Sequence, residues 1–315
     1  MGLDCKWRSG AASDRGLVRG ENQDRSYVRD EDGVFLVVDG LGGHAAGEKA
    51  AETAVEVIQA ELAKPDRDAP QRVRQAITQA NNRIRELGDE NEAWRGMACV
   101  LTLAVMDGER VVVGHVGDSR LYLVWNGAIR KLTSDHSPVG EREDRGELTE
   151  AEAMAHPRRH EVFRDVGSRR REPDEEDFIE MREFALKPDA ALLMCSDGLT
   201  DLVPAAGIQE CVERYDGDPA KVARGLVDAA NLAGGKDNIT VIFVAGEEFL
   251  GSASPAMAEA RTRHSITRMR ATAVAEQAVG VLSRARRALT SRVAFLVYGF
   301  LIGVVLALAM HWPKP

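Results

Sequence analysis

Four aspartates stand where an apolar, strand-like run of the sequence meets glycine, serine or asparagine. They are Asp39, Asp118, Asp197 and Asp237. Taking a carboxylate out of water is costly unless hydrogen bonds or a cation compensate its charge. Because the arrangement recurs four times, we expect the apolar runs to be strands whose ends converge on one cation site.

Short apolar runs separated by turn sequences predict antiparallel strands. Four of them follow one another closely, and the breaks between them include Asp-Gly and Asn-Gly pairs, which indicates a meander. These four runs are Ala98–Val105, Arg110–Val116, Arg120–Val124 and Ala128–Leu132. Further strands are expected at 26–29, 34–39, 178–186, 190–196 and 239–244.

Helical spacing of apolar residues appears in two pairs of segments. The first pair covers residues 47–63 and 70–87, and the second lies near 205–215 and 219–231. Strands alternating with helix pairs favour an α+β fold, a four-layer sandwich of two antiparallel sheets flanked by helix pairs, over a doubly wound sheet. Residues 134–175 lack a core pattern and read as a surface insertion with one short helix, a kind of segment that is often functional.

The C-terminal part contains a long apolar run. Val293–Met310 comprises eighteen residues without a charge, and at ~1.5 Å per residue it would measure roughly 27 Å, close to a bilayer core. A buried core helix is the alternative, although the Tyr and Trp residues in and after the run favour a membrane interface. We therefore predict a transmembrane helix over 293–312.

Charge is divided unevenly along the chain, whose net charge is −9. Residues 249–292 carry eight arginines and two glutamates, a net charge of +6, whereas residues 1–248 carry −16. The acidic part argues against nucleic-acid binding. A basic juxtamembrane linker predicts a single-pass protein of the inner membrane with its large domain in the cytoplasm. Contact with anionic headgroups or a protein-docking surface would also fit this linker.

Several chemistries can be excluded from the sequence. It contains no cysteine-phosphatase loop, no G-x-x-x-x-G-K-[ST] phosphate-binding loop and no G-x-S-x-G nucleophile motif of hydrolases. It also contains no set of cysteines and histidines with the spacing of a structural zinc site. The first ten residues contain no apolar signal core, and the four cysteines form no paired spacing, which suits a reducing compartment. Carboxylates, glycines and one arginine remain as carriers of chemistry.

Carboxylate and carbonyl oxygens are the ligands that Mg²⁺ and Mn²⁺ prefer. Gly40 follows Asp39 directly and would let a backbone carbonyl approach a metal without a side chain in the way. An aspartate bridging two such ions could hold a water between them, lower its pKa and aim it at phosphorus. Arg19 offers a planar fork of donors that matches phosphate oxygens, and we expect it on the first strand.

At these residues the chain resembles the PPM family, the type 2C metal-dependent Ser/Thr protein phosphatases, in its bacterial form. The resemblance covers about residues 8–248, and its motifs occur in family order. Six motifs in order are highly specific, although each alone is weak. The matching stretches are Arg19-x-x-Asn22-Gln23-Asp24, Val37–His44, Val116–Tyr122, Leu132–Ser137, Cys195–Leu199 and Gly234–Thr240.

The resemblance implies roles for these residues. Asp39 would bridge two Mn²⁺ or Mg²⁺ ions, the Gly40 carbonyl would bind one of them, and Asp197 and Asp237 would complete the centre. Asp118 would share a third, weaker ion with Asp197. Arg19 would bind the substrate phosphate, and the insertion at 134–175 would be the flap beside the active site.

The chain departs from the family pattern at two positions. Gln23 stands where many members have glutamate, which predicts somewhat weaker metal binding because a charge is missing. Leu41 stands where eukaryotic members carry a histidine proposed as general acid. A metal-bound water or His44 would have to serve instead, and we favour the water.

Other roles fit some of these residues. Asp118 could be a turn residue ahead of Ser119, and Arg19 could be a structural ion-pair partner. His115, on an apolar run, reads as a core residue rather than a ligand. We expect Asp135 and His136 to secure the flap.

Taken together, the resemblance implies hydrolysis of phosphoserine and phosphothreonine on cytoplasmic proteins by a metal-activated water, reversing a bacterial Ser/Thr kinase. The expected partners are that kinase, its substrates and the membrane. A catalytically inactive phosphoprotein-binding module is the main alternative, although such a module has no need for converging carboxylates. A narrower alternative is a phosphatase that serves one partner-switching or secretion regulator.

Overall fold

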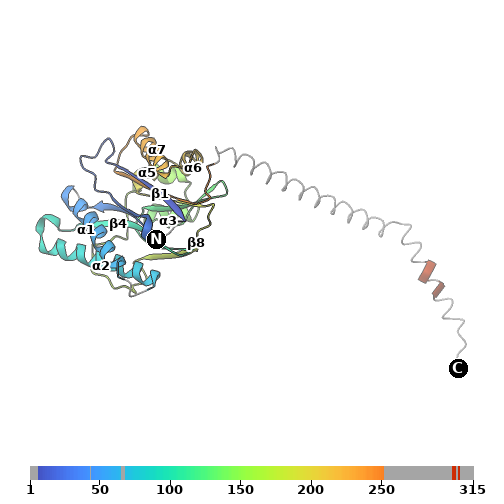
Figure 1. The fold of residues 1–315 in the computed structure, drawn as a ribbon, viewed down its shortest axis with the longest axis horizontal. Coiled ribbons are helices and arrows are strands. Elements are labelled where there is room, and N and C mark those ends of the chain that lie inside the picture. Colours follow the sequence, from blue (N-terminus) through green and yellow to red (C-terminus); the bar gives the residue numbers. More distant parts are fainter. Residues whose placement is uncertain (1–5, 43, 65–67, 252–299, 303, 306–315) are drawn as a thin grey trace, which may run out of the picture. The chain divides into compact units, whose positions relative to one another are not determined.

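The structure is a computed structural model that describes residues 6–42, 44–64, 68–251, 300–302 and 304–305. The chain divides into two compact units, Met1–Pro255 and Ala256–Pro315. The sheets and the helices α1 to α7 lie in the first unit (Figure 1), which contains the predicted domain at 8–248.

Two antiparallel sheets of five strands each form the middle of this unit, as the sequence predicts. The first sheet has the order β1-β10-β9-β6-β7 and the second has the order β2-β3-β4-β5-β8. The strands of the first sheet are β1 (Trp7–Asp14), β10 (Ile239–Gly246), β9 (Ala191–Cys195), β6 (Arg120–Trp125) and β7 (Ala128–Lys131). Those of the second are β2 (Arg25–Arg29), β3 (Val34–Leu41), β4 (Ala98–Asp107), β5 (Arg110–Val116) and β8 (Glu180–Ala185).

Helices cover the outer face of each sheet, which gives four layers. Helices α1 (His44–Leu62) and α2 (Ala69–Glu90) pack on the second sheet, and α6 (Ala205–Glu213) and α7 (Pro219–Leu232) on the first. A separate apolar core that includes Phe35, Leu192 and Ile242 fills the space between the sheets. The predicted α+β sandwich is therefore confirmed for the described residues.

The predicted meander is wrong in one respect. Strands β4 and β5 pair in the second sheet, whereas β6 and β7 pair in the first. The chain crosses between the sheets at Gly117. Its φ of +110° is readily adopted only by glycine, and a Cβ at this position would collide with Val100. Apolar periodicity reports burial and not which sheet a strand joins, so the sequence could not reveal this crossing.

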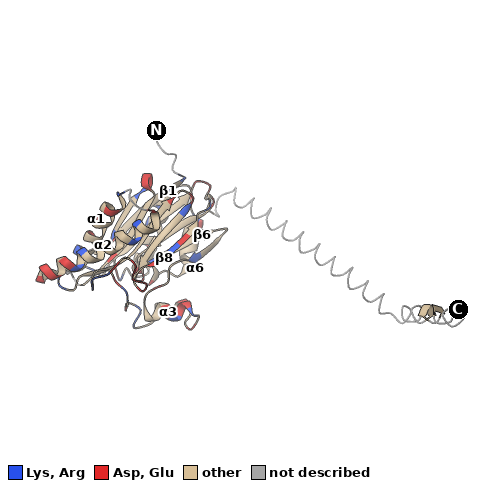
Figure 2. Ribbon diagram, turned by 90° about the horizontal axis from the view of Figure 1, so that it is seen from below, with Lys and Arg blue, Asp and Glu red and all other residues tan. Residues whose placement is uncertain are grey.

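The insertion at 134–175 contains two short helices, where the sequence predicted one. They are α3 (Pro138–Asp144) and α4 (Glu150–Met154). Ser137 caps α3, and a capping box formed by Thr149 and Glu152 starts α4. In Figure 2, α3 lies outside the two sheets and carries both acidic and basic residues. We keep the name flap for residues 134–175.

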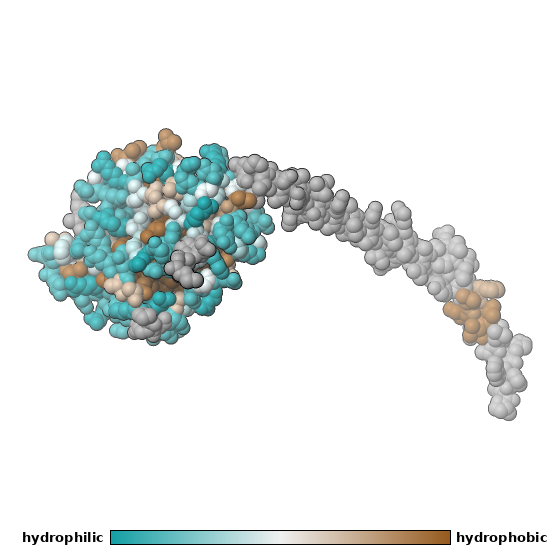
Figure 3. Space-filling view, in the orientation of Figure 1, coloured by the Kyte–Doolittle hydropathy of each residue, from teal (hydrophilic) through white to brown (hydrophobic). Residues whose placement is uncertain are grey.

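The predicted linker and transmembrane helix fall largely outside the described residues. Phe249, at the expected start of the linker, is buried against Tyr215 and Phe243. Residues 300–302, 304 and 305 are helical and exposed, and they stand out as apolar in Figure 3, where the visible face of the first unit is mainly hydrophilic. Among described residues, no helix combines the length and apolar character needed to cross a membrane.

Candidate active site

A cavity of about 290 Å³ lies where strand ends of the two sheets meet. All residues that the sequence analysis assigned to the site line it, namely Arg19, Asp39, Gly40, Asp118, Asp197 and Asp237. Leu41, His160, Val162 and Asn238 are also part of the lining. The structure thus brings the predicted set together, and the role of each residue stays a prediction.

The four aspartates reach the cavity from both sheets. Asp39 lies near the end of β3 in the second sheet, while Asp197 begins the short helix α5 (Asp197–Thr200) directly after β9. Asp237 lies just before β10, and Asp118 lies in the turn between β5 and β6. Convergence of strand ends explains how residues so distant in sequence come together.

Arg19 lies in the loop between β1 and β2, and not on a strand as predicted. Its guanidinium donates a hydrogen bond of 2.7 Å to Asp237 Oδ2, and its side chain is 54% exposed. The β1 strand already ends at Asp14, so the polar stretch that follows is free to turn toward the cavity. The sequence left two roles open for Arg19, an ion-pair partner or a phosphate-binding residue. The structure shows the ion pair and also places Arg19 in the lining of the cavity.

Asn238 holds this loop in place, a role that sequence reasoning missed although the residue belongs to a quoted motif. Its Oδ1 accepts a hydrogen bond of 2.8 Å from the Gln23 N–H. Its Nδ2 donates to the backbone carbonyls of Arg15 and Glu21 at 3.0 and 2.9 Å. One buried amide thus fixes both ends of the segment that carries Arg19.

The acidic side chains of the cavity region repel one another. Burial raises the pKa of Asp39 well above its usual range, and the charges of Asp24 and Asp197 add to the rise. Burial likewise raises the pKa of Asp118, with Asp197 the largest electrostatic contribution. The pKa of Asp24 is raised by burial to about 7, although hydroxyl groups of Thr240 and Ser196 oppose the rise. These carboxylates need a positive charge to remain ionised at neutral pH.

Two carboxylate oxygens in this region have no hydrogen-bond partner within the described part of the chain. They are Asp24 Oδ1 and Asp197 Oδ1, both buried. A buried carboxylate oxygen without a partner is costly, and a bound cation would compensate it. The oxygen-only donor set, the raised pKa values and these oxygens together fit Mg²⁺ or Mn²⁺.

Gly40 is required for packing as well as for access. A Cβ at this position would lie 2.2 Å from the Gly47 carbonyl oxygen in α1 and 2.9 Å from the Gln23 carbonyl oxygen. No side chain fits there, so β3, α1 and the loop after β1 can meet only at a glycine. The sequence argument foresaw a need for glycine but not this contact.

The flap contributes His160, which the sequence analysis did not single out. Its Nδ1 lies 3.8 Å from Asp197 Oδ2 and 3.4 Å from Asp201 Oδ2. The nearby carboxylate of Asp197 raises the pKa of His160, whose side chain is half exposed. Its imidazole stands beside the carboxylates, while Leu41 offers no proton. Nothing in the local sequence sets this histidine apart. The His44 side chain lies outside the described part.

The expectations for the other polar residues can be compared with their contacts. Asp135, in the first part of the flap, accepts hydrogen bonds from both Nε and Nη2 of Arg120 at 2.6 to 3.0 Å. His115 is fully buried, as expected of a core residue. His136 is buried too and does not line the cavity.

Comparison with known proteins identifies related sequences over most of the chain. The model of the family described as "Protein phosphatase 2C" matches residues 18–222. The serine/threonine phosphatase stp of Listeria innocua is 34% identical over 244 residues, which cover 74% of this chain and 93% of that protein. The protein phosphatase PhpP of Streptococcus pneumoniae is 35% identical and is covered to 96%.

Solved structures show the same fold. The serine/threonine phosphatase PstP/Ppp of Mycobacterium tuberculosis superimposes with a TM-score of 0.69 at 31% identity, covering 76% of this chain and 99% of that one. A structure of the catalytic domain of PstP in complex with two manganese ions gives a TM-score of 0.67 at 30% identity, with 76% and 97% covered.

Proposed function

The chain belongs to the protein phosphatase 2C family, and from this premise we propose that its cavity hydrolyses phosphoserine and phosphothreonine in proteins with the help of Mn²⁺ or Mg²⁺. The observation that carries the proposal is the convergence of Asp39, Asp197 and Asp237 with Arg19 in one cavity. Family membership alone would leave open whether this chain retains the groups needed for turnover.

The donor set suits two ions and a weaker third. Asp39, the Gly40 carbonyl, Asp197 and Asp237 would hold two of them, and Asp118 with Asp197 would hold the third. Divalent ions held there would supply Lewis acidity and would lower the pKa of a bound water. Support comes from the raised pKa of Asp39 and from the oxygens of Asp24 and Asp197 that have no hydrogen-bond partner among the described residues.

Arg19 would bind the phosphoryl oxygens of the substrate. Its side chain is more than half exposed and lines the cavity, where the guanidinium pairs with Asp237. A cation on Asp237 would weaken this pair and leave the planar fork of donors for the phosphate. Arg19 would thus already lie near the cation site before the substrate binds.

The flap would shape the entrance for the substrate. Val162 and His160 both line the cavity from this segment. Two ion pairs hold the flap to the rest of the domain, Asp135 with Arg120 and Arg159 with Asp201, the latter at 2.8 Å. A protein loop that carries the phosphoresidue would therefore have to fit against the flap as well as against the carboxylates.

The cellular setting rests on the sequence. We place the domain at the cytoplasmic face of the inner membrane, anchored by residues 293–312, where it would reverse a Ser/Thr kinase. Anchoring would raise the local concentration of membrane-bound kinases and their substrates. Membrane fractionation tests this proposal: the full chain should sediment with membranes, and a chain that lacks the last 25 residues should not.

Turnover of phosphopeptides tests the proposed activity. The full chain should release phosphate from phosphoserine and phosphothreonine peptides in the presence of Mn²⁺, lose this activity in EDTA and recover it when Mn²⁺ is restored. Binding of the peptides without release of phosphate would instead identify an inactive recognition module.

A further inference from the structure

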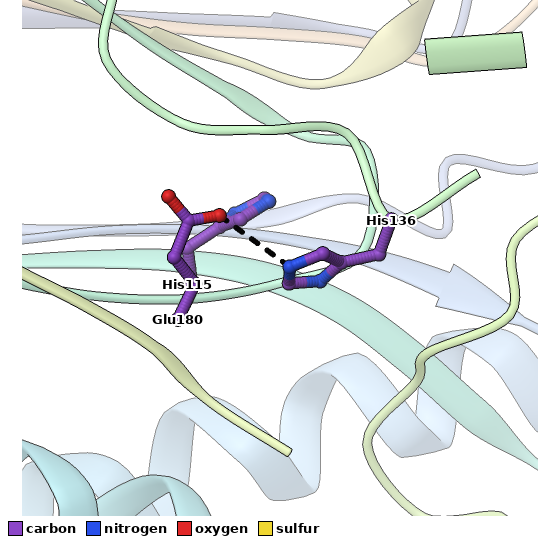
Figure 4. A group of neighbouring side chains, drawn as sticks. All are labelled: His115, His136 and Glu180. Atoms are coloured by element: carbon purple, nitrogen blue, oxygen red, sulfur yellow. Dashed lines mark ion pairs between the residues drawn. The ribbon is translucent and has the colours of Figure 1, made fainter. Parts of the chain in front are cut away.

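A second group of titratable side chains lies next to the cavity without lining it. His115 on β5, His136 at the start of the flap and Glu180 at the start of β8 come together in Figure 4. The two imidazole rings are buried, and their centroids are 4.9 Å apart. Such a cluster of two histidines and a carboxylate could hold a metal ion or could form a hydrogen-bond network.

The hydrogen bonds of His115 show that neither of its nitrogens is available to a metal. Its Nε2 lies 3.0 Å from the Gly117 carbonyl and 3.1 Å from the Ser134 carbonyl. Carbonyls only accept, so Nε2 carries the proton, and Nδ1 accepts from the Thr102 hydroxyl at 2.9 Å. Burial, with the neighbouring His136, lowers the pKa of His115 to about 4, which keeps the ring neutral at physiological pH.

His136 is fixed in the same tautomer. Its Nδ1 accepts a hydrogen bond of 3.0 Å from the Gly117 N–H, so its proton resides on Nε2. That nitrogen faces Glu180 Oε2 at 3.4 Å, the contact drawn in Figure 4. The Arg164 guanidinium also lies 3.4 Å from Nε2 of His136. Both the guanidinium and the protonated Nε2 are donors, and the negative charge of Glu180 compensates the repulsion between them. The cluster is therefore a directed network and not a set of free ligands.

This network holds both neighbours of Asp118. The backbone N–H of Gly117 donates to the ring nitrogen Nδ1 of His136. The Gly117 carbonyl accepts from the backbone N–H of His136 at 2.7 Å and from Nε2 of His115. On the other side, the Ser119 hydroxyl lies 2.8 Å from Thr102 Oγ1. Because Thr102 donates to His115, Ser119 is the donor in this last bond. The backbone that presents Asp118 to the cavity is thus fixed from both directions.

The network also connects to the flap. The His136 carbonyl accepts a hydrogen bond of 2.9 Å from the Phe163 N–H, and the two rings lie 6.2 Å apart. Phe163 directly follows Val162, which lines the cavity. In addition, the Ser134 N–H donates to Glu180 Oε2 at 3.2 Å. Two segments of the flap that are far apart in sequence therefore meet at His136.

From this arrangement we propose that His136, oriented by Glu180, is a positioning residue that sets the Asp118 carboxylate for a divalent cation and links its position to the flap. The inference rests on the proposed function, because it assigns Asp118 to the cation site. His136 does not touch the substrate or the cation. It acts through the backbone of Gly117, which is held by these hydrogen bonds and packs so closely on Val100 that an added Cβ would lie 2.2 Å from it.

Loss of an outer partner of a metal ligand typically lowers metal affinity or activity by about 10- to 100-fold. The proposal requires a hydrogen-bond acceptor for the Gly117 N–H at the position of His136 Nδ1. Leucine at position 136 removes this acceptor, whereas the side-chain oxygen of asparagine can take its place and still receive the Gly117 N–H. His136→Leu and His136→Asn are therefore a matched pair.

Equilibrium binding of Mn²⁺ to the full chain tests the proposal, with Asp118→Asn as the reference. His136→Leu should lower the affinity of the weakest Mn²⁺ site by about 10-fold or more, as Asp118→Asn does, while the tighter ions remain. His136→Asn should bind Mn²⁺ nearly as the unmodified chain does. Thermal unfolding of the metal-free variants, recorded in parallel, reports on general damage.

Two outcomes would overturn the proposal. One is a binding curve of His136→Leu that coincides with that of the unmodified chain. The other is an equal loss of affinity and of melting temperature in both variants, which would make His136 a purely structural residue. Failure of the proposed function is seen separately, as a chain that binds Mn²⁺ but releases no phosphate from phosphopeptides.

Discussion

Arg19 and Asp237, which are 218 positions apart, form an ion pair of 2.7 Å at the edge of the acidic cavity. The pair joins the predicted phosphate ligand to a predicted metal ligand. Each partner would be released for its own task when a cation binds Asp237 and a phosphate approaches Arg19. The contact therefore relates substrate binding to metal binding in a way that can be tested.

Replacing Arg19 should weaken substrate binding more than folding. A hydrogen bond to a charged group is worth about 1.5–3 kcal/mol, so Arg19→Ala should lower kcat/KM for a phosphopeptide by roughly 10- to 100-fold at saturating Mn²⁺. Arg29→Ala is the matched control, since Arg29 is an ion-paired arginine of similar exposure that lies outside the cavity lining. Equal kinetics for both variants would argue that Arg19 is only an ion-pair partner.

Asn238 should act through Arg19. Asn238→Ala removes the present partner of the Gln23 N–H and of the Arg15 and Glu21 carbonyls, at a cost of about 0.5–1.5 kcal/mol for each hydrogen bond lost. We expect a raised KM for phosphopeptides because the loop that carries Arg19 loosens. In a double-mutant cycle the effects of Asn238→Ala and Arg19→Ala on kcat/KM should be less than additive. Full additivity would show that the two residues act independently.

Adding a methyl group at Gly40 should damage both folding and activity. The Cβ of Gly40→Ala would lie 2.2 Å from the Gly47 carbonyl oxygen, so β3 and α1 would have to separate. Overpacking of this kind costs about 1–3 kcal/mol, which urea denaturation of the metal-free protein can measure. Gly20→Ala is the control because no atom lies within 4 Å of the added group, and its unfolding free energy should change by less than about 0.5 kcal/mol.

The helices and strands that the sequence predicted well are those in which the pattern of apolar residues shows which positions are buried. Apolar runs located β3, β9 and β10 to within a few residues, and helical spacing located α1 and α7. The aspartates converged in one cavity as expected, since carboxylates at the ends of buried strands need their charge compensated. The predicted convergence thus followed from a desolvation cost that each run revealed by itself, and the binding of a cation there stays a prediction.

The features that the sequence did not reveal depend on contacts between distant segments. The crossing at Gly117 joins strands of different sheets, and the loop position of Arg19 depends on the bonds made by Asn238. His160 comes within 3.8 Å of Asp197 because the ion pair of Arg159 with Asp201 holds this part of the flap beside α5. None of these residues differs in local sequence from an ordinary turn, loop or surface residue.

The buried His115 should make the stability depend on pH. Its folded pKa of about 4 is lower than its usual value of 6.5, so between these values the unfolded chain binds a proton that the folded chain does not. Stability contributed by this residue is therefore lost as the pH falls from about 6.5 to 4, by up to about 3 kcal/mol. The groups that face the ring and contribute to its pKa are His136, Glu180 and Asp135.

Comparing the unmodified chain with His115→Gln isolates this effect from the other acidic groups. The substitution should destabilise the protein most at pH 7, and its cost should shrink toward pH 4. Urea denaturation at several pH values, without added metal, provides the measurement. A cost that stays constant over this range would show that His115 does not titrate as its burial requires.

The account depends most directly on the cation site at Asp39. Mn²⁺ binding and phosphopeptide turnover should be measured together on the unmodified chain, on Asp39→Asn and on Asp32→Asn, an exposed control in the turn that precedes β3. We expect Asp39→Asn to lose Mn²⁺ affinity and turnover by at least about 100-fold, since loss of a ligand should exceed the effect of outer-shell changes, and Asp32→Asn to match the unmodified chain. Turnover by Asp39→Asn at the unmodified rate, with unchanged Mn²⁺ binding, would contradict the metal-dependent mechanism.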